Sequence, residues 1–155
     1  MQGWDHARSG PPQIEDLVWD EAPQGGALHA IQVRGKRWPT SEHYFQAQKF
    51  AAQRDQEEIR NASTPVLAAR LGRDRKRKLR RDWEIVKVGV MREAVEAKFR
   101  QHPEFRVLLL ETRDTQLIEH TDNDAFWGDG GDGSGRNELG RILMAVRQRL
   151  REDGD

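Results

Sequence analysis

Residues 28–50 read LHAIQVRGKRWPTSEHYFQAQKF, and this stretch predicts a strand followed by a helix. Apolar side chains at positions 28, 31 and 33 are compatible with a short β-strand, which Gly35 ends. Pro39, Thr40 and Ser41 then form a helix start, because the hydroxyls can accept the first free N–H groups. We expect a strand over residues 28–34 and a helix over residues 41–53.

Further helices and one short strand are predicted along the rest of the chain. Thr64 followed by Pro65 is a good helix start, and Gly72 ends that helix. Asp82 and Asn137 can cap two longer helices whose apolar residues recur at helical spacing. In the first of these, the residues expected to face the core are Val88, Met91, Val95 and Phe99. The expected helices cover residues 55–61, 65–72, 82–101, 103–112 and 137–150, and the strand covers residues 116–120.

Together these elements predict a mainly helical α+β fold with short β-strands. We expect one compact domain over residues 27–155. Residues 1–26 are rich in Gly, Pro and Gln and show no sustained periodicity, so we expect them to form a loosely ordered N-terminal arm.

The composition limits the classes of protein to which this chain can belong. The chain has 155 residues, with 26 Lys and Arg against 26 Asp and Glu, and no cysteine. Disulfides, thiolate zinc sites and a cysteine nucleophile are therefore excluded, and a reducing compartment is expected. The longest apolar run covers only residues 107–110, and no apolar signal segment is visible near the N-terminus. We expect a cytoplasmic protein with no membrane span and no metal or other cofactor.

Charge is unevenly distributed although the formal net charge is zero. Residues 70–82 contain eight basic and two acidic side chains, whereas residues 119–132 contain five acidic side chains and neither Lys nor Arg. Such a separation can build a ligand site whose two ends differ in sign. Two independently solvated segments are the alternative.

A glycine-rich segment is the first candidate for chemistry. Residues 128–135 read GDGGDGSG, and a predicted helix follows. Glycine lets backbone N–H groups approach a ligand closely, and the helix start together with Arg136 adds positive charge. A phosphate group is therefore a reasonable ligand, although the segment matches neither a Walker A loop nor an EF-hand. The alternative is a flexible loop without function.

The predicted helix after Thr40 is the second candidate. Glu42, Gln46 and Lys49 share one helix face, and this set suits general acid and base catalysis on a polar substrate. An exposed charged stripe is the alternative.

Trp83 and Trp127 adjoin charged turns, where each could stack on a nucleobase or pack into the core. No arrangement typical of a serine hydrolase or a zinc protease is present.

Several blocks of the chain resemble the NADAR family, the YbiA-like N-glycosidases. They span about residues 28–150 in order. The matching blocks are residues 35–50, 69–75, 82–84, 91–94, 97–99, 108–110, 119–121, 124–131 and 137–141.

This resemblance implies a hydrolase of N-glycosidic bonds to ribose. The expected substrate is a phosphorylated ribosyl compound, either a ribosylamine intermediate of riboflavin synthesis or ADP-ribosylated guanine in nucleic acid. The resemblance implies three catalytic residues: Glu42 as the carboxylate near ribose C1, Asp129 as the acid of the glycine-rich loop, and Lys36 as an amine able to form a Schiff base. The residues expected to bind substrate are Trp83, Trp127, Arg70, Arg73, Gly130, Arg136 and Asn137.

One departure from the family lies near the N-terminus. Members usually carry a Phe-Ser-Asn-Phe stretch ahead of the block at residues 35–50, where this chain has Pro23-Gln24-Gly25-Gly26. Two alternatives therefore stay open beside the enzyme: a catalytically silent module that binds ADP-ribose or a nucleotide, and nucleic-acid binding through residues 70–81. The sequence leaves the oligomeric state open.

Overall fold

The computed structural model describes residues 17–18 and 28–154. The described residues group into two compact units, one from Val18 to Gln101 and the other comprising Leu17 and the chain from His102 onward. Each unit is described by itself. The predicted N-terminal arm lies outside the described residues except for Leu17 and Val18, which are buried.

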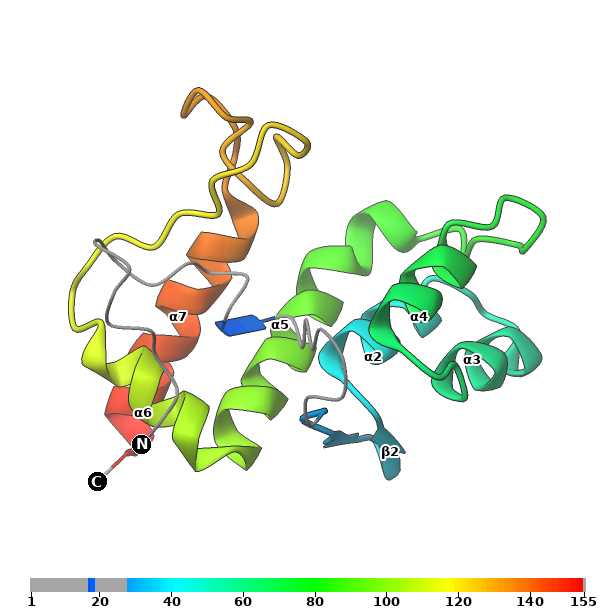
Figure 1. Ribbon diagram of the computed structural model, residues 1–155, viewed down its shortest axis with the longest axis horizontal. Coiled ribbons are helices and arrows are strands. Elements are labelled where there is room, and N and C mark those ends of the chain that lie inside the picture. The colour runs from blue at the N-terminus through cyan, green and yellow to red at the C-terminus, as the bar shows by residue number, and fades with distance from the viewer. Residues whose placement is uncertain (1–16, 19–27, 155) are drawn as a thin grey trace. The chain divides into compact units, whose positions relative to one another are not determined.

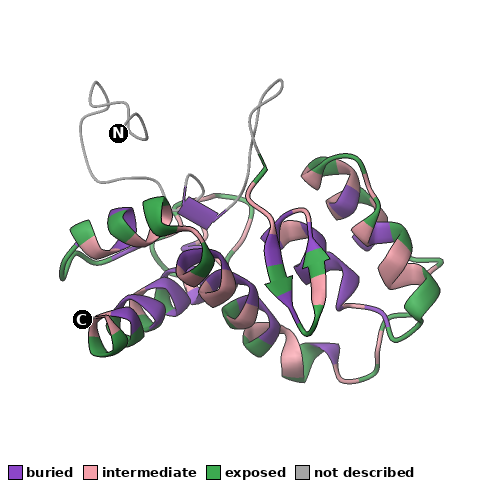
Figure 2. Ribbon diagram, turned by 90° about the horizontal axis from the view of Figure 1, so that it is seen from below, coloured by how far each residue is buried: buried purple, intermediate pink, exposed green. Residues whose placement is uncertain are grey.

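A β-hairpin opens the first unit. Strands β1 (Ile31–Val33) and β2 (Lys36–Trp38) pair antiparallel, with Ile31 opposite Trp38 and Val33 opposite Lys36. The two residues of the turn, Arg34 and Gly35, both have positive φ angles of 53° and 80°, as a tight hairpin turn requires. Buried and exposed residues alternate along β1, so one face of the hairpin packs inward (Figure 2).

Helix α2 (Ser41–Ala47) starts where the sequence predicts but ends earlier than residue 53. The Thr40 side chain caps it by accepting a hydrogen bond from the His43 N–H at 3.1 Å. Beyond the helix, Phe50 forms an antiparallel bridge with Leu79, and Arg80 N donates to Lys49 O at 2.8 Å. Because residues 49 and 50 pair with this distant segment, the helix cannot continue through them.

Three more helices complete the first unit (Figure 1). They are α3 (Gln53–Arg60), α4 (Pro65–Gly72) and α5 (Trp83–Gln101), and each agrees with a predicted segment. Helix α2 packs against all three, and α5 also packs against β1. On α5, the predicted core residues Met91, Val95 and Phe99 are buried, whereas Val88 is only partly buried.

The second unit contains α6 (Pro103–Glu111) and α7 (Glu138–Asp153), which pack against each other. Helix α7 carries a continuous buried face (Figure 2). Its buried apolar residues are Leu139, Ile142, Leu143, Val146 and Leu150.

One local prediction in the second unit is wrong, and another holds only in part. Residues 116–120 form no strand, because their backbone groups bond elsewhere. Glu119 N donates to the Asn137 side chain at 2.8 Å, and the Asn137 amide donates to Leu117 O at 2.9 Å. Asn137 is the N-cap residue of α7, as predicted, but its side chain bonds to this segment and makes no capping hydrogen bond to the helix.

Helices dominate the described residues, and a single two-stranded sheet accompanies them there. This confirms the predicted α+β, mainly helical fold class. Within the part of the chain that the structure describes, no helix is both long and apolar enough to span a membrane.

Candidate active site

The first candidate cluster lies on α2 and directly after it. The Glu42 carboxylate accepts a hydrogen bond from the Gln46 amide at 2.9 Å. The Lys49 amine donates to Gly72 O at 3.4 Å and lies 5.9 Å from the centre of the Phe45 ring. Although Lys49 lies beyond the end of α2, Glu42 and Lys49 are near enough for each charge to shift the pKa of the other group.

Burial shifts the pKa values of both groups towards their neutral forms. It raises the pKa of the Glu42 carboxyl, while the Gln46 hydrogen bond and the charges of Lys49 and Arg73 oppose that shift. Burial lowers the pKa of the Lys49 amine, and the Glu42 charge opposes the change. A carboxyl and an amine tuned in this way are suited to proton transfer or nucleophilic attack.

Helix α4 approaches this cluster through its last residue, Gly72. A Cβ atom at this position would lie 2.1 Å from the Gln46 Oε1 atom, so only glycine fits without displacing that side chain. Gln46 Oε1 is buried and has no hydrogen-bond partner among the described residues. The amide thus holds Glu42 with its nitrogen and keeps an unused acceptor beside Gly72.

A cavity of about 360 Å³ adjoins the cluster. Trp83 forms part of its wall but is only 6 % exposed, and its ring packs against Phe45 with 5.2 Å between ring centres. Phe50, Leu79 and Gly72 also line it, and the other lining residues are charged. These are Lys49, Arg73, Asp74, Arg75 and Arg77. An anionic substrate group would therefore meet several positive charges here.

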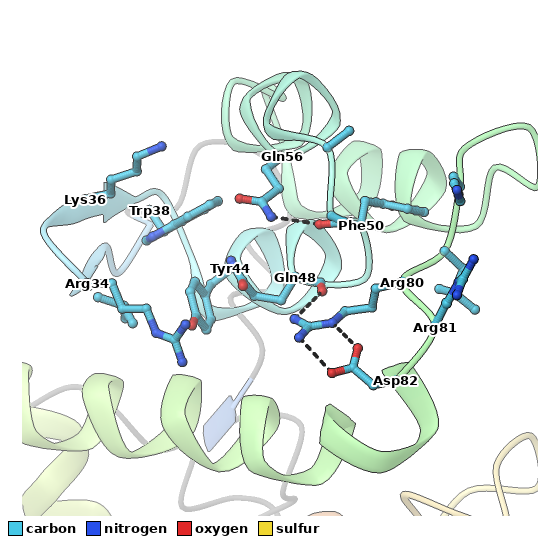
Figure 3. A pocket seen from close by; sticks show the side chains of 15 residues that line it. Arg34, Lys36, Trp38, Tyr44, Gln48, Phe50, Gln56, Arg80, Arg81 and Asp82 are labelled. Atoms are coloured by element: carbon cyan, nitrogen blue, oxygen red, sulfur yellow. Dashed lines mark hydrogen bonds and ion pairs between the residues drawn. The ribbon is translucent and has the colours of Figure 1, made fainter.

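Lys36 lies elsewhere in the first unit. Its amine is ion-paired with Glu57 at 2.9 Å, and hydrogen bonds from Arg60 and Lys36 lower the pKa of Glu57 to about 2. Lys36 lines a separate cavity of about 890 Å³ (Figure 3). Phe50 and Leu79 line both cavities. The structure therefore does not bring Lys36 into the cavity that Lys49 lines.

In the basic segment, residues 70–82, some cationic side chains are ion-paired and others are exposed. Arg77 is only 12 % exposed and binds Asp55 at 2.7 Å and Glu58 at 2.8 Å. Arg70 is exposed on α4 and lines neither cavity, whereas Arg73 is exposed and lines the smaller one. Of these two predicted substrate-binding residues, only Arg73 lies beside the Glu42 cluster.

The second candidate cluster, in the other unit, is centred on Asp129. This carboxylate is 7 % exposed and accepts hydrogen bonds from the Gly131 N–H at 2.9 Å and the Thr121 N–H at 3.2 Å. Its other oxygen lies 2.8 Å from His120 Nδ1. The His120 contact is the largest cause, followed by the backbone donors, that lowers the pKa of Asp129. Asp129 is thus an ionised group whose oxygens already hold the loop and orient a histidine.

His120 was not among the predicted site residues. Its side chain is 66 % exposed, so the Asp129–His120 pair presents an imidazole at the surface with one ring nitrogen oriented by a carboxylate. The sequence did carry a signal, since His120 belongs to one of the blocks that resemble the NADAR family. Its pairing with Asp129 depends on the fold of the glycine-rich loop.

The other predicted residues of this unit surround the loop. Gly130 has a φ of 74°, a conformation that glycine adopts readily. The Arg136 guanidinium binds Glu138 at 2.9 Å and covers the Phe126 ring at 4.9 Å. Trp127 is partly buried and meets Phe126 edge to face, with 4.9 Å between ring centres. As described above, Asn137 holds residues 117 and 119.

Throughout the described ranges, no three His, Asp or Glu side chains are grouped so that they could hold a metal ion.

Comparison with known proteins places the chain in a family. The family model of the NADAR domain matches residues 17–151, so the chain belongs to the NADAR family. It is 60% identical over 124 residues to N-glycosidase YbiA of Escherichia coli (strain K12), a match covering 80% of this chain and 78% of that protein. It is also 47% identical to N-glycosidase Npun_R5314 of Nostoc punctiforme, over 79% of this chain and 81% of the relative.

A solved structure agrees with the fold. The NMR structure of the Escherichia coli protein YbiA matches with a TM-score of 0.74 at 58% identity, over 80% of this chain and 74% of the other. A further relative, the riboflavin biosynthesis protein VVA0006 of Vibrio vulnificus, is 53% identical over 79% of this chain but only 34% of its own length. This chain therefore corresponds to about one third of that longer protein.

Proposed function

We propose that this protein hydrolyses the bond between ribose C1 and nitrogen in a phosphorylated ribosyl compound, with Glu42 as the central catalytic group. The observation that carries the proposal is the Glu42 carboxyl with its raised pKa, bonded to Gln46 and close to Lys49 beside a cationic cavity. Asp129, Lys36 and the predicted substrate-binding residues remain part of the proposal, with Lys36 as the alternative to Lys49 for an attacking amine.

The enzyme class rests on the relatives. Proteins of 47% to 60% identity over about four fifths of this chain are named N-glycosidases, and the chain is accordingly a hydrolase of N-glycosyl bonds. For the substrate, the relative named a riboflavin biosynthesis protein favours a ribosylamine intermediate of that synthesis. ADP-ribosylated guanine is the other substrate that the family resemblance implies.

The chemistry of the bond explains why a carboxyl is needed. Breaking a ribose C1–N bond develops positive charge on C1 and the ring oxygen, which an ionised carboxylate stabilises. The leaving nitrogen also requires a proton, which a carboxyl of raised pKa can donate. Glu42 in its ionised form suits the first demand, since the Gln46 hydrogen bond and the charges of Lys49 and Arg73 favour that form. Because burial raises its pKa, the carboxylate can also take a proton from the water that attacks C1 and pass it on to the leaving nitrogen.

If the reaction passes through a Schiff base, Lys49 suits the role of nucleophile better than Lys36. Burial lowers the pKa of the Lys49 amine, which increases the share of the uncharged form. Lys36 instead donates to Glu57 at 2.9 Å, a contact that its amine would have to give up before it could attack ribose C1. Lys49 also lies near Glu42, since the charge of each group shifts the pKa of the other.

Arg73 is the cation best placed to meet a substrate phosphate, because it is exposed and lines the cavity beside Glu42. Trp83 would then act as a cavity wall, since its ring is packed against Phe45. In the other unit, Asp129 would serve by orienting His120, and Trp127 offers a partly exposed ring for stacking on a base.

The test is the Glu42→Gln variant, assayed for release of the free base or amine from a riboflavin-pathway ribosylamine and from ADP-ribosylated guanosine DNA. We expect turnover to fall by about 10²–10⁴-fold, the usual contribution of a general acid or base. Glu104→Gln, an exposed change in the first turn of α6, is the matched control and should keep full activity. Full turnover of Glu42→Gln would refute the assignment of Glu42.

The same assay separates the enzyme from a silent binding module. Such a module would bind ADP-ribose, as seen by calorimetry, while cleaving neither substrate. The family departure at residues 23–26 that motivates this alternative lies outside the described residues. The cytoplasmic location remains a prediction.

A further inference from the structure

Of the residues that line the larger cavity of the first unit, only Lys36 has a part in the proposed reaction. The cavity measures about 890 Å³ and is lined by the hairpin, Tyr44 of α2, Gln48, residues 50–52, Gln56 of α3 and residues 78–82. Figure 3 shows Arg34 and Lys36 at one end, Arg80 and Arg81 at the other, and Trp38 and Tyr44 between them. In all, five cationic side chains and one carboxylate line it. These are Arg34, Lys36, Lys78, Arg80, Arg81 and Asp82.

Three of these cations have carboxylate partners. Arg34 pairs with Glu93 at 3.2 Å, Lys36 with Glu57 at 2.9 Å and Arg80 with Asp82 at 2.6 Å. Lys78 and Arg81 are exposed, and within the described residues neither has a hydrogen bond or an ion pair. The cavity therefore carries an excess of positive charge that an anion can neutralise.

The aromatic residues of the cavity offer no exposed ring on which a base could stack. Trp38, Tyr44 and Phe50 are only 2 %, 1 % and 2 % exposed. Recognition here therefore rests on charge, for which phosphate groups are the natural ligands.

The positive lining continues past the edge of this cavity. Phe50 and Leu79 form a wall shared with the smaller cavity, on whose side Arg75 is exposed. Arg77 lies between Arg75 and Leu79 in the sequence, but its guanidinium is held by Asp55 and Glu58. Unpaired cations thus lie on both sides of the Phe50–Leu79 bridge, an arrangement that suits several linked phosphates better than one.

We propose that the larger cavity is a binding site for linked phosphate groups, with Lys78 and Arg81 as its principal contacts and Arg75 extending it across the Phe50–Leu79 bridge. The ligand chemistry is shared by the backbone of a single-stranded oligonucleotide and by inorganic polyphosphate. This site is additional to the proposed N-glycosidase activity and does not depend on it.

The experiment measures binding by the full chain of a short fluorescein-labelled oligothymidylate, by fluorescence anisotropy, between about 50 and 200 mM salt. A second arm measures inorganic tripolyphosphate by calorimetry. The test variant is Lys78→Gln/Arg81→Gln. The control is Lys76→Gln/Arg54→Gln, which removes the same two types of charge from exposed positions that line neither cavity.

The test variant should bind the oligonucleotide more weakly, and its slope of log K against log salt should fall by about 1.4, since each lost contact to single-stranded phosphate removes about 0.7. The control variant should bind like the unaltered chain. Arg75→Gln should weaken the oligonucleotide arm more than the tripolyphosphate arm, because only the longer ligand reaches across the bridge.

If either ligand binds in a way that depends on Lys78 and Arg81, the site is supported. The arm that binds shows whether its ligand is an oligonucleotide or inorganic polyphosphate. The proposal is overturned if neither ligand binds the unaltered chain, or if the control variant loses as much affinity as the test variant. Hydrolysis of a ribosylamine by Lys78→Gln/Arg81→Gln tests the two proposals separately. Retained turnover together with lost binding supports a distinct phosphate site, whereas absent turnover in the unaltered chain contradicts only the N-glycosidase assignment.

Discussion

At the scale of single residues, the site around Glu42 includes a close approach of Gly72 on α4 to the Gln46 side chain on α2. The Gln46 amide lies between the Glu42 carboxylate, to which it donates at 2.9 Å, and Gly72, which leaves no room for a side chain. The hydrogen bond from Gln46 also holds the pKa of Glu42 below the value that burial alone would produce. A glycine thus acts on the acidity of a residue that it does not touch.

Gly72→Ala tests this relation. The added methyl group would lie 2.1 Å from Gln46 Oε1 and 3.0 Å from Gln46 Cβ, so the side chain must move. We expect a loss of about 1–3 kcal/mol in the free energy of unfolding, as for other overpacked sites. Because Glu42 loses a hydrogen bond to its ionised form, its pKa should rise further, and the acidic limb of the pH–rate profile should move to higher pH.

The measurement combines urea unfolding with kcat determined across the pH range. Gly89→Ala is the matched control, since a Cβ atom there meets nothing within 4 Å. An unchanged pH profile in a destabilised Gly72→Ala variant would show that Gln46 does not tune Glu42.

A second residue-scale prediction concerns the Asp129–His120 pair. Asp129→Ala removes the acceptor for two backbone N–H groups as well as the partner of His120, so both the melting temperature and turnover should fall. His120→Ala removes only the imidazole, so turnover should fall with a smaller loss in melting temperature. For both variants, calorimetry measures the melting temperature and the base-release assay measures turnover. Equal thermal losses in the two variants would contradict the view that Asp129 holds the loop as well as the histidine.

Local spacing was enough to predict that Glu42 and Gln46 share a helix face, because residues four apart lie on one side of a helix. The predicted helix face did not hold for Lys49, which lies beyond the end of α2, so its nearness to Glu42 depends on the chain after the helix. Local spacing also could not predict that Gly72 closes on Gln46 or that His120 meets Asp129, since these contacts depend on how separate segments fold together. The catalytic and binding roles of the predicted site residues stay predictions.

At the scale of secondary-structure elements, the starts of α2 and α4 were predictable, whereas the end of α2 was not. The Thr40 and Thr64 side chains bond to N–H groups three residues ahead, so the signal is local. The end of α2 is set instead by the pairing of Phe50 with Leu79, 29 residues away in the sequence. Asn137 marks the start of α7 as predicted, but its side chain bonds to residues 117 and 119 and not to the helix.

The cap of α4 supplies the prediction at this scale. Thr64 Oγ1 accepts from Leu67 N at 3.0 Å, and Thr64 is exposed, so Thr64→Ala removes this interaction and little else. We expect a loss of about 1 kcal/mol in the free energy of unfolding. For a chain of this size, that corresponds to a fall of about 2–4 °C in Tm.

Ser63→Ala, at the exposed neighbouring position, is the control and should leave Tm unchanged within error. Because α4 carries Gly72 at its end, fraying of its first turn should lower turnover less than Gly72→Ala does. A Thr64→Ala variant as stable as the unaltered chain would mean that Pro65 alone sets the start of the helix.

At the scale of the whole molecule, the equal numbers of acidic and basic residues conceal carboxylates whose pKa values are lowered by their partners. Hydrogen bonds from Arg60 and Lys36 bring the pKa of Glu57 from 4.5 to about 2. A hydrogen bond from Arg80 lowers the pKa of Asp82, and one from Ser134 lowers that of Asp132. The chain therefore depends on ionised carboxylates in both of its units.

Stability should consequently fall in acid. Each of these carboxyls has a lower pKa in the folded than in the unfolded state, so the unfolded chain binds more protons. Their contribution is present above about pH 4.5, the ordinary value for Glu57, and is lost as the pH falls towards 2. Glu42 acts in the opposite direction, since its raised pKa favours folding at low pH and this contribution is lost as the pH rises through its folded value.

Urea unfolding at pH 7 and pH 3 measures this balance, with a lower free energy of unfolding expected at pH 3. Glu57→Gln should reduce the difference between the two pH values, because the variant has no proton to gain at this position. A stability that is equal at both pH values in the unaltered chain would contradict the net effect of the paired carboxylates.

The fixed position of Arg77 has a consequence for any ligand of the segment that joins α4 to α5. Asp55 and Glu58 on α3, together with Asp74, hold this guanidinium, which anchors the middle of the segment. Ordering a mobile side chain during association costs about 0.5–1.5 kcal/mol of conformational entropy. Because this anchor holds the middle of the segment when the chain folds, we expect an anion to order only the side chains of the cations beside Arg77, and its association to need no slower rearrangement of the segment.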